Sequence, residues 1–380
     1  MPHEIILTNA RIVTADEIVS GSLAIRDGKI ADLDARPSAL PEAQNLEGDY
    51  LMPGLIELHT DNLEKHMSPR PGVDWPPLSA AITHDAQVVA SGITTVFDAI
   101  SIGEIHRRGQ RLATLMPMLE AVDHATQHGL LRAEHRLHLR CEVVHPETLG
   151  LFERLAGHPR LSLVSIMDHS PGQRQYVSLD KYRVYYQGKY GLNDDEIEEL
   201  IEVQSNKAKQ NSDRQRKAIA AHCAARRLPL ASHDDATAAH AEESAALGMA
   251  IAEFPTTLEA ARTSRQKGLK VLMGAPNVIR GGSHSGNVSA RALAEEGVLD
   301  ILSSDYYPSS LLHAAMTLAG TAGHTLPAAI NTVSRTPARA VGLADRGEIK
   351  PGLRADLIQA RLHQGHPLIR QVWQQGDRIF

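Results

Sequence analysis

Eight short apolar runs, separated by longer stretches of helical character, constrain the fold of this chain more than any other feature of its sequence. The runs read LMPGLIELHTD, GITTVFDAI, RLHLRCEVVH, RLSLVSIMDH, LPLASHDDA, MAIAEFPTT, LKVLMGAPN and LDILSSDYYP. Apolar strands that alternate with helices are typical of βα units around a parallel sheet. Eight such units close a barrel. The pattern therefore predicts the α/β class and a (β/α)₈ TIM barrel over residues 51–343.

Polar side chains stand at the carboxyl ends of these runs, where a buried strand would ordinarily give way to turn residues. In a (β/α)₈ barrel the carboxyl ends of all strands share one face, on which the active site lies. Residues far apart in the sequence can therefore meet in one pocket. The residues at these ends are His59, Asp61, Asp98, Glu142, Asp168, His169, His233, Asp234, Glu253, Asn277 and Asp305.

The two ends of the chain carry a different pattern. Residues 1–50 hold short alternating segments, such as IILTNARIVT and GSLAIRDGKIADL, separated by Gly, Asp and Pro. Residues 344–380 contain RGEIKPGLRADLIQARL and VWQQGDRIF, which again alternate like strands. Short alternating segments bounded by turn residues indicate β-structure. We expect both termini to complete one small β-domain; the alternative for the C-terminal segment is a disordered tail.

The composition argues against several classes of function. A formal net charge of −6 over 380 residues does not suit a general nucleic-acid-binding protein, which needs an excess of Lys and Arg. Only two cysteines occur, Cys141 and Cys223, which disfavours a disulfide framework or a thiolate zinc site. The first residues lack a basic leader with an apolar core, and no stretch is long enough to span a bilayer. We therefore expect a cytoplasmic protein with neither nucleic acid nor a membrane as partner.

The first run ends in a pattern that can bind a metal. His59 and Asp61 are two positions apart, so their side chains lie on the same side of a strand. On its own, such a pair is more often an ordinary polar contact. Joined with the other strand-end residues, it gives a mixed nitrogen and oxygen set that suits two divalent ions, zinc, manganese or magnesium, better than a soft metal. The candidate ligands are His59, Asp61, Glu142, His169, His233 and Asp305.

Asp305, at the end of the eighth run, is the candidate catalytic residue. A divalent ion lowers the pKa of bound water towards neutrality, and a carboxylate can take the proton as a general base and return it as a general acid. The alternative for Asp305 is a helix N-cap after the strand. Asp234 and Asp235 either orient His233 from behind or are solvated loop residues, and the sequence leaves both roles open.

Three stretches rich in basic or small residues indicate a binding site for an anion. They are LEKHMSPRPG, SPGQRQYVSLDKYRVYYQGKYG and GAPNVIRGGSHSGN, and the glycines of the third let backbone N–H groups surround an oxyanion. Each has a plain alternative as a surface flap or a flexible turn. Together, in an acidic protein, they predict a strongly negative small-molecule substrate. The candidate substrate-binding residues are Lys65, His66, Arg70, Arg174, Lys181, Arg183, Lys189, Asn277, Arg280, Ser283 and His284.

The segment over residues 171–227 is longer than a βα connection needs. Its portion NDDEIEELIEVQSNKAKQ has helical character. The segment is predicted to be an active-site lid, or else a peripheral helical insertion or a contact between subunits of a homo-oligomer.

The motifs of this chain resemble those of the amidohydrolase superfamily, which are metal-dependent hydrolases on a (β/α)₈ barrel with a β-domain built from both termini. The resemblance rests on PGLIELHTD, TPARAVGL, KPGLRADLI and the order of the eight runs. Within the superfamily, HTDNLEKH, MDHSPGQRQ, SHDDAT, EFPTT, MGAPN, RGGSHSGN and SSDYYPSSLL resemble the branch that serves the carbon-phosphorus lyase pathway. The resemblance implies hydrolysis of a ribose 1-methylphosphonate 5-triphosphate to the 5-phosphate and pyrophosphate, and a functional link to the other enzymes of that pathway.

The chain departs from the general superfamily pattern in three respects. Asp61 replaces the second histidine of the usual His-x-His, and no lysine stands at a strand end to bridge two ions, so Glu142 is the expected bridge. Glu253 stands where many relatives have histidine, and its side chain is expected either behind the ligands or facing the substrate. Two other functions stay open, namely hydrolysis of an amide or a cyclic nitrogen compound, and a metal-free scaffold of the same fold.

Overall fold

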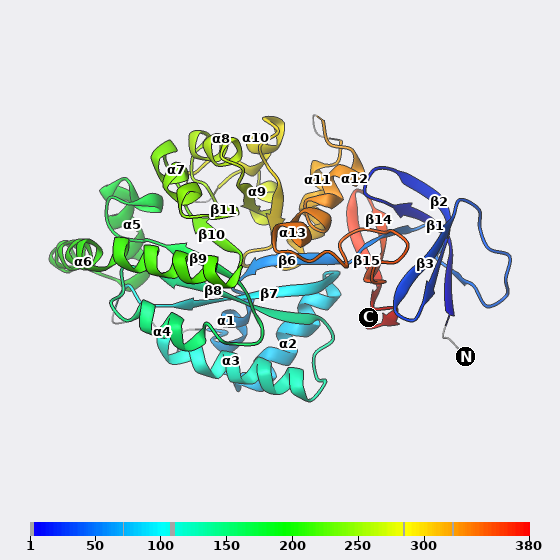
Figure 1. Cartoon of the computed structure of the whole chain (residues 1–380), viewed down its shortest axis with the longest axis horizontal. Coiled ribbons are helices and arrows are strands. Elements are labelled where there is room, and N and C mark those ends of the chain that lie inside the picture. The colour runs from blue at the N-terminus through cyan, green and yellow to red at the C-terminus, as the bar shows by residue number, and fades with distance from the viewer. Residues whose placement is uncertain (1–3, 71, 107–110, 284–285, 321–322) are drawn as a thin grey trace.

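Two sheets organise this chain, and Figure 1 shows them towards opposite ends of the long axis of the molecule. The structure is a computed structural model that describes residues 4–70, 72–106, 111–283, 286–320 and 323–380. The larger unit is a barrel of parallel strands surrounded by helices, and the smaller is a mixed sheet. Both termini lie on the side of the mixed sheet.

The barrel consists of eight parallel strands that pair in chain order. The last strand returns to the first, because Thr60 and Asp305 form a parallel bridge in which the Asp305 N–H donates to the His59 carbonyl at 3.1 Å. The predicted (β/α)₈ barrel is therefore confirmed. Its strands are β6 (Leu55–Thr60), β7 (Ile93–Ile102), β8 (Glu134–Glu142), β9 (Leu161–Met167), β10 (Leu230–His233), β11 (Ile251–Glu253), β12 (Lys270–Gly274) and β13 (Ile301–Ser303).

The strands read as nearly continuous apolar runs because helices cover their outer side while the barrel interior buries the other. All ten residues of β7 are buried, for example. Side chains from alternate positions fill the interior, among them Ile56, Leu58 and Phe97. Val341 and Leu343 join the same cluster from the segment after helix α13 (Arg335–Ala340). The interior is thus a packed core rather than a pore. A binding site can therefore form only at an end of the barrel, such as the carboxyl ends of the strands.

Helices form the outer layer around the barrel (Figure 1). Three of them begin at threonine N-caps whose side chains accept a backbone N–H, Thr237, Thr257 and Thr325. The helices before α13 are α1 (Asn62–Met67), α2 (Pro77–Ala90), α3 (Arg111–Gln127), α4 (Thr148–Leu155), α5 (Leu179–Tyr190), α6 (Asp194–Arg226), α7 (Ala238–Ala246), α8 (Leu258–Gln266), α9 (Ala275–Arg280), α10 (Ala290–Glu295), α11 (Ser310–Leu318) and α12 (Leu326–Asn331), with a 3₁₀ turn η1 (Arg174–Tyr176).

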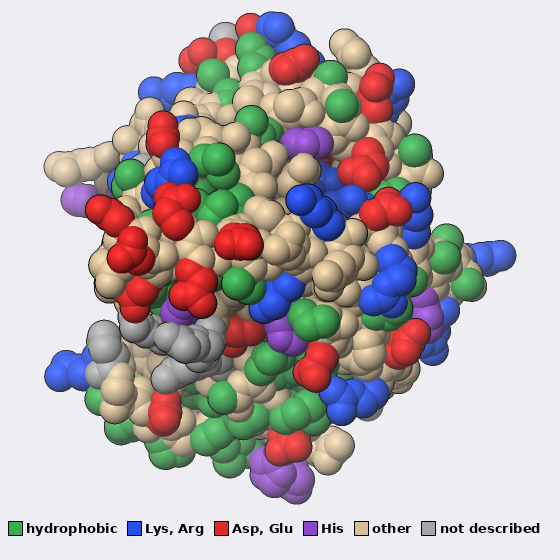
Figure 2. All heavy atoms as spheres, turned by 90° about the vertical axis from the view of Figure 1, so that its left-hand side faces the viewer, with side chains coloured by type: hydrophobic (Ala, Val, Ile, Leu, Met, Phe, Trp, Pro, Cys, Tyr) green, Lys and Arg blue, Asp and Glu red, His purple; other side chains and the backbone are tan. Residues whose placement is uncertain are grey.

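Helices α5 and α6 form the long insertion after β9, and the helical character predicted for it is confirmed. Helix α6 begins at a capping box, in which the Asn193 side chain accepts from the Glu196 N–H at 2.9 Å and the Glu196 carboxylate accepts from the Asn193 N–H at 2.9 Å. Figure 2 views the molecule from this end and shows acidic and basic side chains interspersed over the face. The role of the insertion as a lid, a peripheral helical insertion or a subunit contact stays a prediction.

The smaller sheet takes strands from both ends of the chain, as predicted. Its strand order is β16-β15-β14-β5-β1-β2-β3, and β4 pairs with β1. Leu23, Leu51 and Trp373 belong to its apolar core. The domain limits at residues 50 and 343 stay a prediction, although β5 already pairs within this sheet. The strands are β1 (Glu4–Val13), β2 (Ile18–Arg26), β3 (Lys29–Asp34), β4 (Gln44–Asn45), β5 (Tyr50–Pro53), β14 (Leu357–His363), β15 (His366–Gln374) and β16 (Asp377–Arg378).

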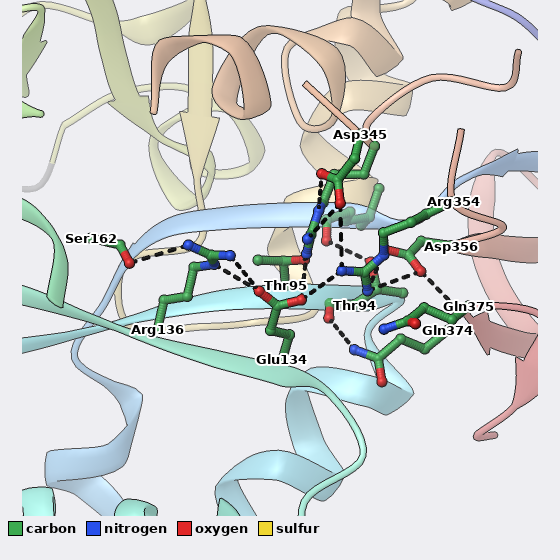
Figure 3. Close-up of polar contacts among 12 residues, drawn as sticks. Thr94, Thr95, Glu134, Arg136, Ser162, Asp345, Arg354, Asp356, Gln374 and Gln375 are labelled. Atoms are coloured by element: carbon green, nitrogen blue, oxygen red, sulfur yellow. Dashed lines mark hydrogen bonds and ion pairs between the residues drawn. The ribbon is translucent and has the colours of Figure 1, made fainter. Parts of the chain in front are cut away.

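A cluster of charged side chains joins the barrel to the C-terminal segment (Figure 3). The Glu134 carboxylate, at the start of β8, accepts from Arg346 at 2.6 Å and from Arg354 at 2.7 Å. Arg354 also contacts Asp356 at 3.1 Å, directly before β14. These contacts lie at the amino ends of the barrel strands. They therefore fix the barrel to the small sheet without occupying the carboxyl ends of the strands.

Among the described residues, no helix combines the length and apolar character needed to cross a membrane.

Candidate active site

A cavity of about 300 Å³ opens at the carboxyl ends of the barrel strands. Strands β6, β10 and β13 carry His59, His233 and Asp305 to its wall, and the turn after β9 adds His169. Sequence reasoning placed all of these residues in one pocket because strand ends share a face, and the structure brings them together. Their roles as ligands remain proposals. The predicted ligands that line the cavity are His59, Asp61, His169, His233 and Asp305.

Glu253 orients two of these histidines from behind. Its side chain is fully buried, with Oε1 at 3.1 Å from Nδ1 of His59 and Oε2 at 3.2 Å from Nδ1 of His233. His233 and Glu253 are register partners on β10 and β11, which brings the carboxylate to this place. Since a carboxylate accepts, each Nδ1 carries the proton and each Nε2 is left with a lone pair. Of the two roles that the sequence left open for Glu253, this contact favours the one behind the ligands.

The imidazoles of His59 and His233 are held in the neutral form. Burial lowers the pKa of His59 well below its usual value. Burial also lowers the pKa of His233, to about 3, although the hydrogen bond to Glu253 acts to raise it. A neutral ring is the form that binds a metal.

One carboxylate in the cavity lacks the partner that a buried charge normally has, and a second lies close to it. Asp61 Oδ1 is buried and has no hydrogen-bond partner among the described residues. Asp61 stands at the N-cap position of α1 but its side chain caps nothing. Burial, with the nearby charge of Asp61, raises the pKa of Asp305 to about 7. Two carboxylates that repel each other beside neutral imidazoles fit a site for divalent cations.

The N-cap alternative for Asp305 does not hold. Helix α11 begins at Ser310 and its N-cap is Ser309, four residues beyond Asp305. Asp305 instead has a φ of 54°, in the left-handed region, where its carbonyl accepts from the Asp61 N–H at 3.2 Å. Such a backbone conformation costs energy in a residue other than glycine, and it is retained where the surroundings fix it.

His169 and Glu142 form a close pair at the edge of the cavity. Nδ1 of His169 lies 2.5 Å from Oε2 of Glu142, and the His169 N–H donates to Oε1 of the same carboxylate at 3.2 Å. Burial lowers the pKa of His169, but Glu142 and Asp234 outweigh it and raise the pKa to about 9. A bound cation would replace this proton, because only the neutral ring can be a ligand. Glu142 is fully buried and does not line the cavity, so its predicted bridging role stays a proposal.

Asp234 and Asp235 have separate surroundings. Asp234 lines the cavity, with Oδ2 at 3.5 Å from Nε2 of His233 and 3.6 Å from Nε2 of His169. It therefore lies on the cavity side of both rings, and His169, His233 and Asp234 together could hold one ion. Asp235 points away, where it pairs with Arg174 and accepts from the Ser244 hydroxyl at 2.9 Å.

The predicted substrate-binding residues divide between the cavity and other places. Arg280, Asn277 and Ser283 line the cavity. His284 lies outside the described residues. Lys65 donates to the carbonyl of Tyr306, a residue that lines the cavity. Lys189 lines a smaller, separate chamber that adjoins the cavity.

Several predicted cations lie away from the cavity, which corrects the expectation that the basic loops all face it. Arg174 is buried and contacts Asp235 and Glu243, because the turn η1 directs it towards α7. Arg183 is held by Glu198, at 2.7 Å, on the adjoining helix. His66 contacts Gln87 at 2.8 Å. Arg70 and Lys181 are exposed and do not line the cavity.

Two arginines that sequence reasoning missed supply charge in their place. Arg140 and Arg111 both line the cavity. Arg140 is 7% exposed, and its Nε has no hydrogen-bond partner among the described residues. Its position two residues before Glu142 in RLHLRCEVVH was a usable signal, because alternate strand residues share a side. Arg111 begins α3 and carried no local signal of this kind.

Comparison with known proteins places the chain in a family. No family model matches it. The curated protein alpha-D-ribose 1-methylphosphonate 5-triphosphate diphosphatase of Escherichia coli (strain K12) is 54% identical over 377 residues, which cover 99% of this chain and 100% of that protein. This chain belongs to the alpha-D-ribose 1-methylphosphonate 5-triphosphate diphosphatase family.

Solved structures show that this member of the diphosphatase family has the amidohydrolase fold. A structure of N-acetyl-D-glucosamine-6-phosphate deacetylase from Mycobacterium smegmatis covers 99% of both chains, with a TM-score of 0.64 and 15% identity. The structure of a protein described as an amidohydrolase also covers 99% of both, with a TM-score of 0.63 and 14% identity. Identities this low establish the shared fold alone, and they confirm the predicted resemblance at that level.

Proposed function

We propose that this chain hydrolyses alpha-D-ribose 1-methylphosphonate 5-triphosphate to the corresponding 5-phosphate and pyrophosphate. The observation that carries the proposal is the composition of the cavity, whose wall combines imidazoles and carboxylates with Arg111, Arg140 and Arg280. Membership of the diphosphatase family supports the same substrate. An amide or a cyclic nitrogen compound carries too little negative charge to need three guanidinium groups.

Two divalent ions, zinc, manganese or magnesium, are the cofactors in this proposal. The unpartnered Asp61 oxygen and the neutral rings of His59 and His233 support it. When bound, such ions lower the pKa of water and neutralise phosphate charge. The proposed ligands are His59, Asp61, Glu142, His169, His233 and Asp305, with Asp234 added from its place in the cavity.

Asp305 is the proposed proton carrier. Its carboxylate lies at the wall of the cavity, where it can take a proton from the attacking water and then return it to the product. Its fixed backbone holds the side chain at the wall of the cavity beside Asp61.

The arginines serve the polyphosphate. Arg140 has a buried, unpartnered N–H, and a phosphate oxygen would satisfy it. Arg280 lies at the end of α9 on the same wall as Asn277 and Ser283. These groups would stabilise the charge that builds on the leaving pyrophosphate. The product, a sugar phosphonate 5-phosphate, would pass to the enzymes of the carbon-phosphorus lyase pathway.

The proposal is tested by incubating the purified protein with the sugar triphosphate and measuring pyrophosphate release with and without added inorganic pyrophosphatase. We expect equal amounts of pyrophosphate and 5-phosphate, loss of activity on chelation, and recovery with one of the three metals. Asp305→Asn should lower kcat by about 1,000-fold. Arg280→Ala should lower kcat/KM by about 100-fold without lowering Tm, whereas Arg262→Ala, at an exposed pair with Glu296, should change neither.

Hydrolysis of amides without release of pyrophosphate would contradict the proposal, and so would equal losses of activity and stability in Arg280→Ala. A protein that binds no divalent ion and hydrolyses nothing would instead support a scaffold. Hydrolysis in ¹⁸O-labelled water, followed by mass analysis of both products, then identifies the phosphorus that water attacks.

A further inference from the structure

A small side chamber adjoins the main cavity, and the two share Arg111, His169, Gln175 and Tyr185. The chamber has a volume of about 40 Å³, against about 300 Å³ for the cavity. It is therefore too small for a sugar but has room for one tetrahedral group. The residues that line the chamber but not the main cavity are Glu104, Ile105, Tyr176, Tyr186, Lys189 and Tyr190.

We infer that this chamber binds the methylphosphonate group of the substrate while the triphosphate occupies the main cavity. The inference rests on the proposed function. The two groups are attached to opposite ends of one ribose, at C1 and C5, so a substrate that spans both spaces places one group in each. The shared residues His169, Gln175 and Tyr185 would then lie beside the sugar.

The chamber offers cationic side chains to a methylphosphonate ester, which carries one negative charge. Arg111 comes from α3 and Lys189 from α5, so two cations from separate helices meet there. Lys189 Nζ lies 5.5 Å and 5.4 Å from the ring centroids of Tyr185 and Tyr190. Glu104 is the carboxylate that lines the chamber, and it accepts from the Leu112 N–H at 3.4 Å. Glu64 and Glu142 also lie close enough to act on Arg111. Among the side chains that line the chamber, Arg111, Lys189 and the His169 imidazole therefore face one carboxylate.

The aromatic wall suits both parts of the same group. Tyr176 and Tyr186 are buried, and burial raises the pKa of each phenol, so both stay neutral. The two phenols share a hydrogen bond, which leaves one O–H of the pair to donate to an oxyanion. Their ring centroids lie 5.5 Å apart, and the Tyr186 and Tyr190 rings stack at 5.9 Å. These rings, with Ile105, offer apolar surface to the methyl group that distinguishes a methylphosphonate from a phosphate.

The experiment compares kcat/KM for the methylphosphonate substrate and for ribose 5-triphosphate, which lacks the group at C1. The wild-type protein should prefer the methylphosphonate substrate. Lys189→Met should lower its kcat/KM by about 30-fold, mainly through KM, and that for ribose 5-triphosphate by less than about 3-fold. Lys189→Arg should keep most of the preference. Tyr186→Phe should lower the preference by about 5-fold and serves as a second variant if Lys189→Met does not fold.

Lys209→Met is the matched control, because Lys209 is exposed on α6 and lines neither space. It should leave the preference unchanged. Equal losses for both substrates in Lys189→Met and Tyr186→Phe would overturn the inference, as would a wild-type protein without preference, and either result would leave triphosphate hydrolysis standing. A wild-type protein inactive on both triphosphates would refute the proposed function, and the inference with it.

Discussion

A single buried carboxylate, Glu253, decides which atoms the two central histidines present to the cavity. It contacts Nδ1 of His59 at 3.1 Å and Nδ1 of His233 at 3.2 Å. His138 lies close by, with Nε2 at 3.8 Å from the same carboxylate. A carboxylate that holds a ring N–H fixes the ring and makes the other nitrogen a better ligand. Charge and geometry at Glu253 would therefore act on a bound ion through the two histidines, without direct contact.

Glu253→Gln should weaken the binding of divalent ions by about 10 to 100-fold. An amide has one acceptor oxygen, so one of the two imidazole N–H groups loses its partner. Competition against a fluorescent chelator measures the affinity. Glu259→Gln, at an exposed position on α8, is the control. Wild-type affinity in Glu253→Gln would show that Glu253 does not position the histidines.

At the scale of elements, a buried chain of hydrogen bonds fastens α2 to strands β7 and β8. Asp98 contacts Nε2 of His84 at 2.8 Å and Nδ1 of His135 at 3.0 Å. Asp85 lies 3.4 Å from Nε2 of His135 and accepts from the Ala133 N–H at 2.9 Å. His84 continues the chain to Asn62, the neighbour of Asp61, at 3.0 Å. The cluster thus fixes α1 as well as α2.

This cluster makes stability depend on pH. Burial lowers the pKa of His135, but Asp98 and Asp85 outweigh it and raise the pKa to about 9. Because this value exceeds that of the unfolded chain, the interaction stabilises fully below about pH 6.5 and is lost as the pH rises through about 9. His135→Asn should cost about 3 kcal/mol at pH 6 and much less at pH 9.5.

Denaturant unfolding of both proteins at several pH values measures this difference, with His363→Asn, at an exposed position on β14, as the control. A cost that stays constant from pH 6 to pH 9.5 would contradict an imidazolium at His135.

At the scale of the whole molecule, the junction of Figure 3 ties the barrel to the sheet that both termini build. Glu134 is its centre, since it contacts Arg136, Arg346 and Arg354 within 2.7 Å. Arg346 is nearly buried, and Arg354 is 11% exposed at its side chain. Buried guanidinium groups are costly to leave without their carboxylate.

Glu134→Gln should therefore lower the free energy of unfolding by about 2 kcal/mol at pH 7. Burial would raise the pKa of Glu134, but Arg346 and Arg354 outweigh it and lower the pKa to about 2. The stabilisation is thus present above about pH 4.5 and is lost as the pH falls towards 2. Urea unfolding at pH 7 measures it, against the exposed Glu153→Gln. Equal stability of Glu134→Gln and the wild-type protein would mean that the junction carries no net stabilisation.

The sequence by itself determined the barrel, the terminal sheet and the face on which the site lies. Strands buried on both sides must be apolar along their length, and polar residues at their ends then stand out, as His59, His233 and Asp305 do. These features are local and periodic, so they can be recognised in the sequence without knowing which segments contact each other in the folded chain. The motifs at the same positions also carried the resemblance to the family.

Only the tertiary structure decided which charged side chains face the cavity. Arg174 follows His169 by five residues, yet the turn between them directs it to Asp235 and Glu243. Arg111 has no distinguishing neighbours in the sequence, yet α3 brings it to both the cavity and the side chamber. The direction of a side chain in a loop or at a helix start depends on how whole elements pack, and packing depends on contacts between residues far apart in the chain.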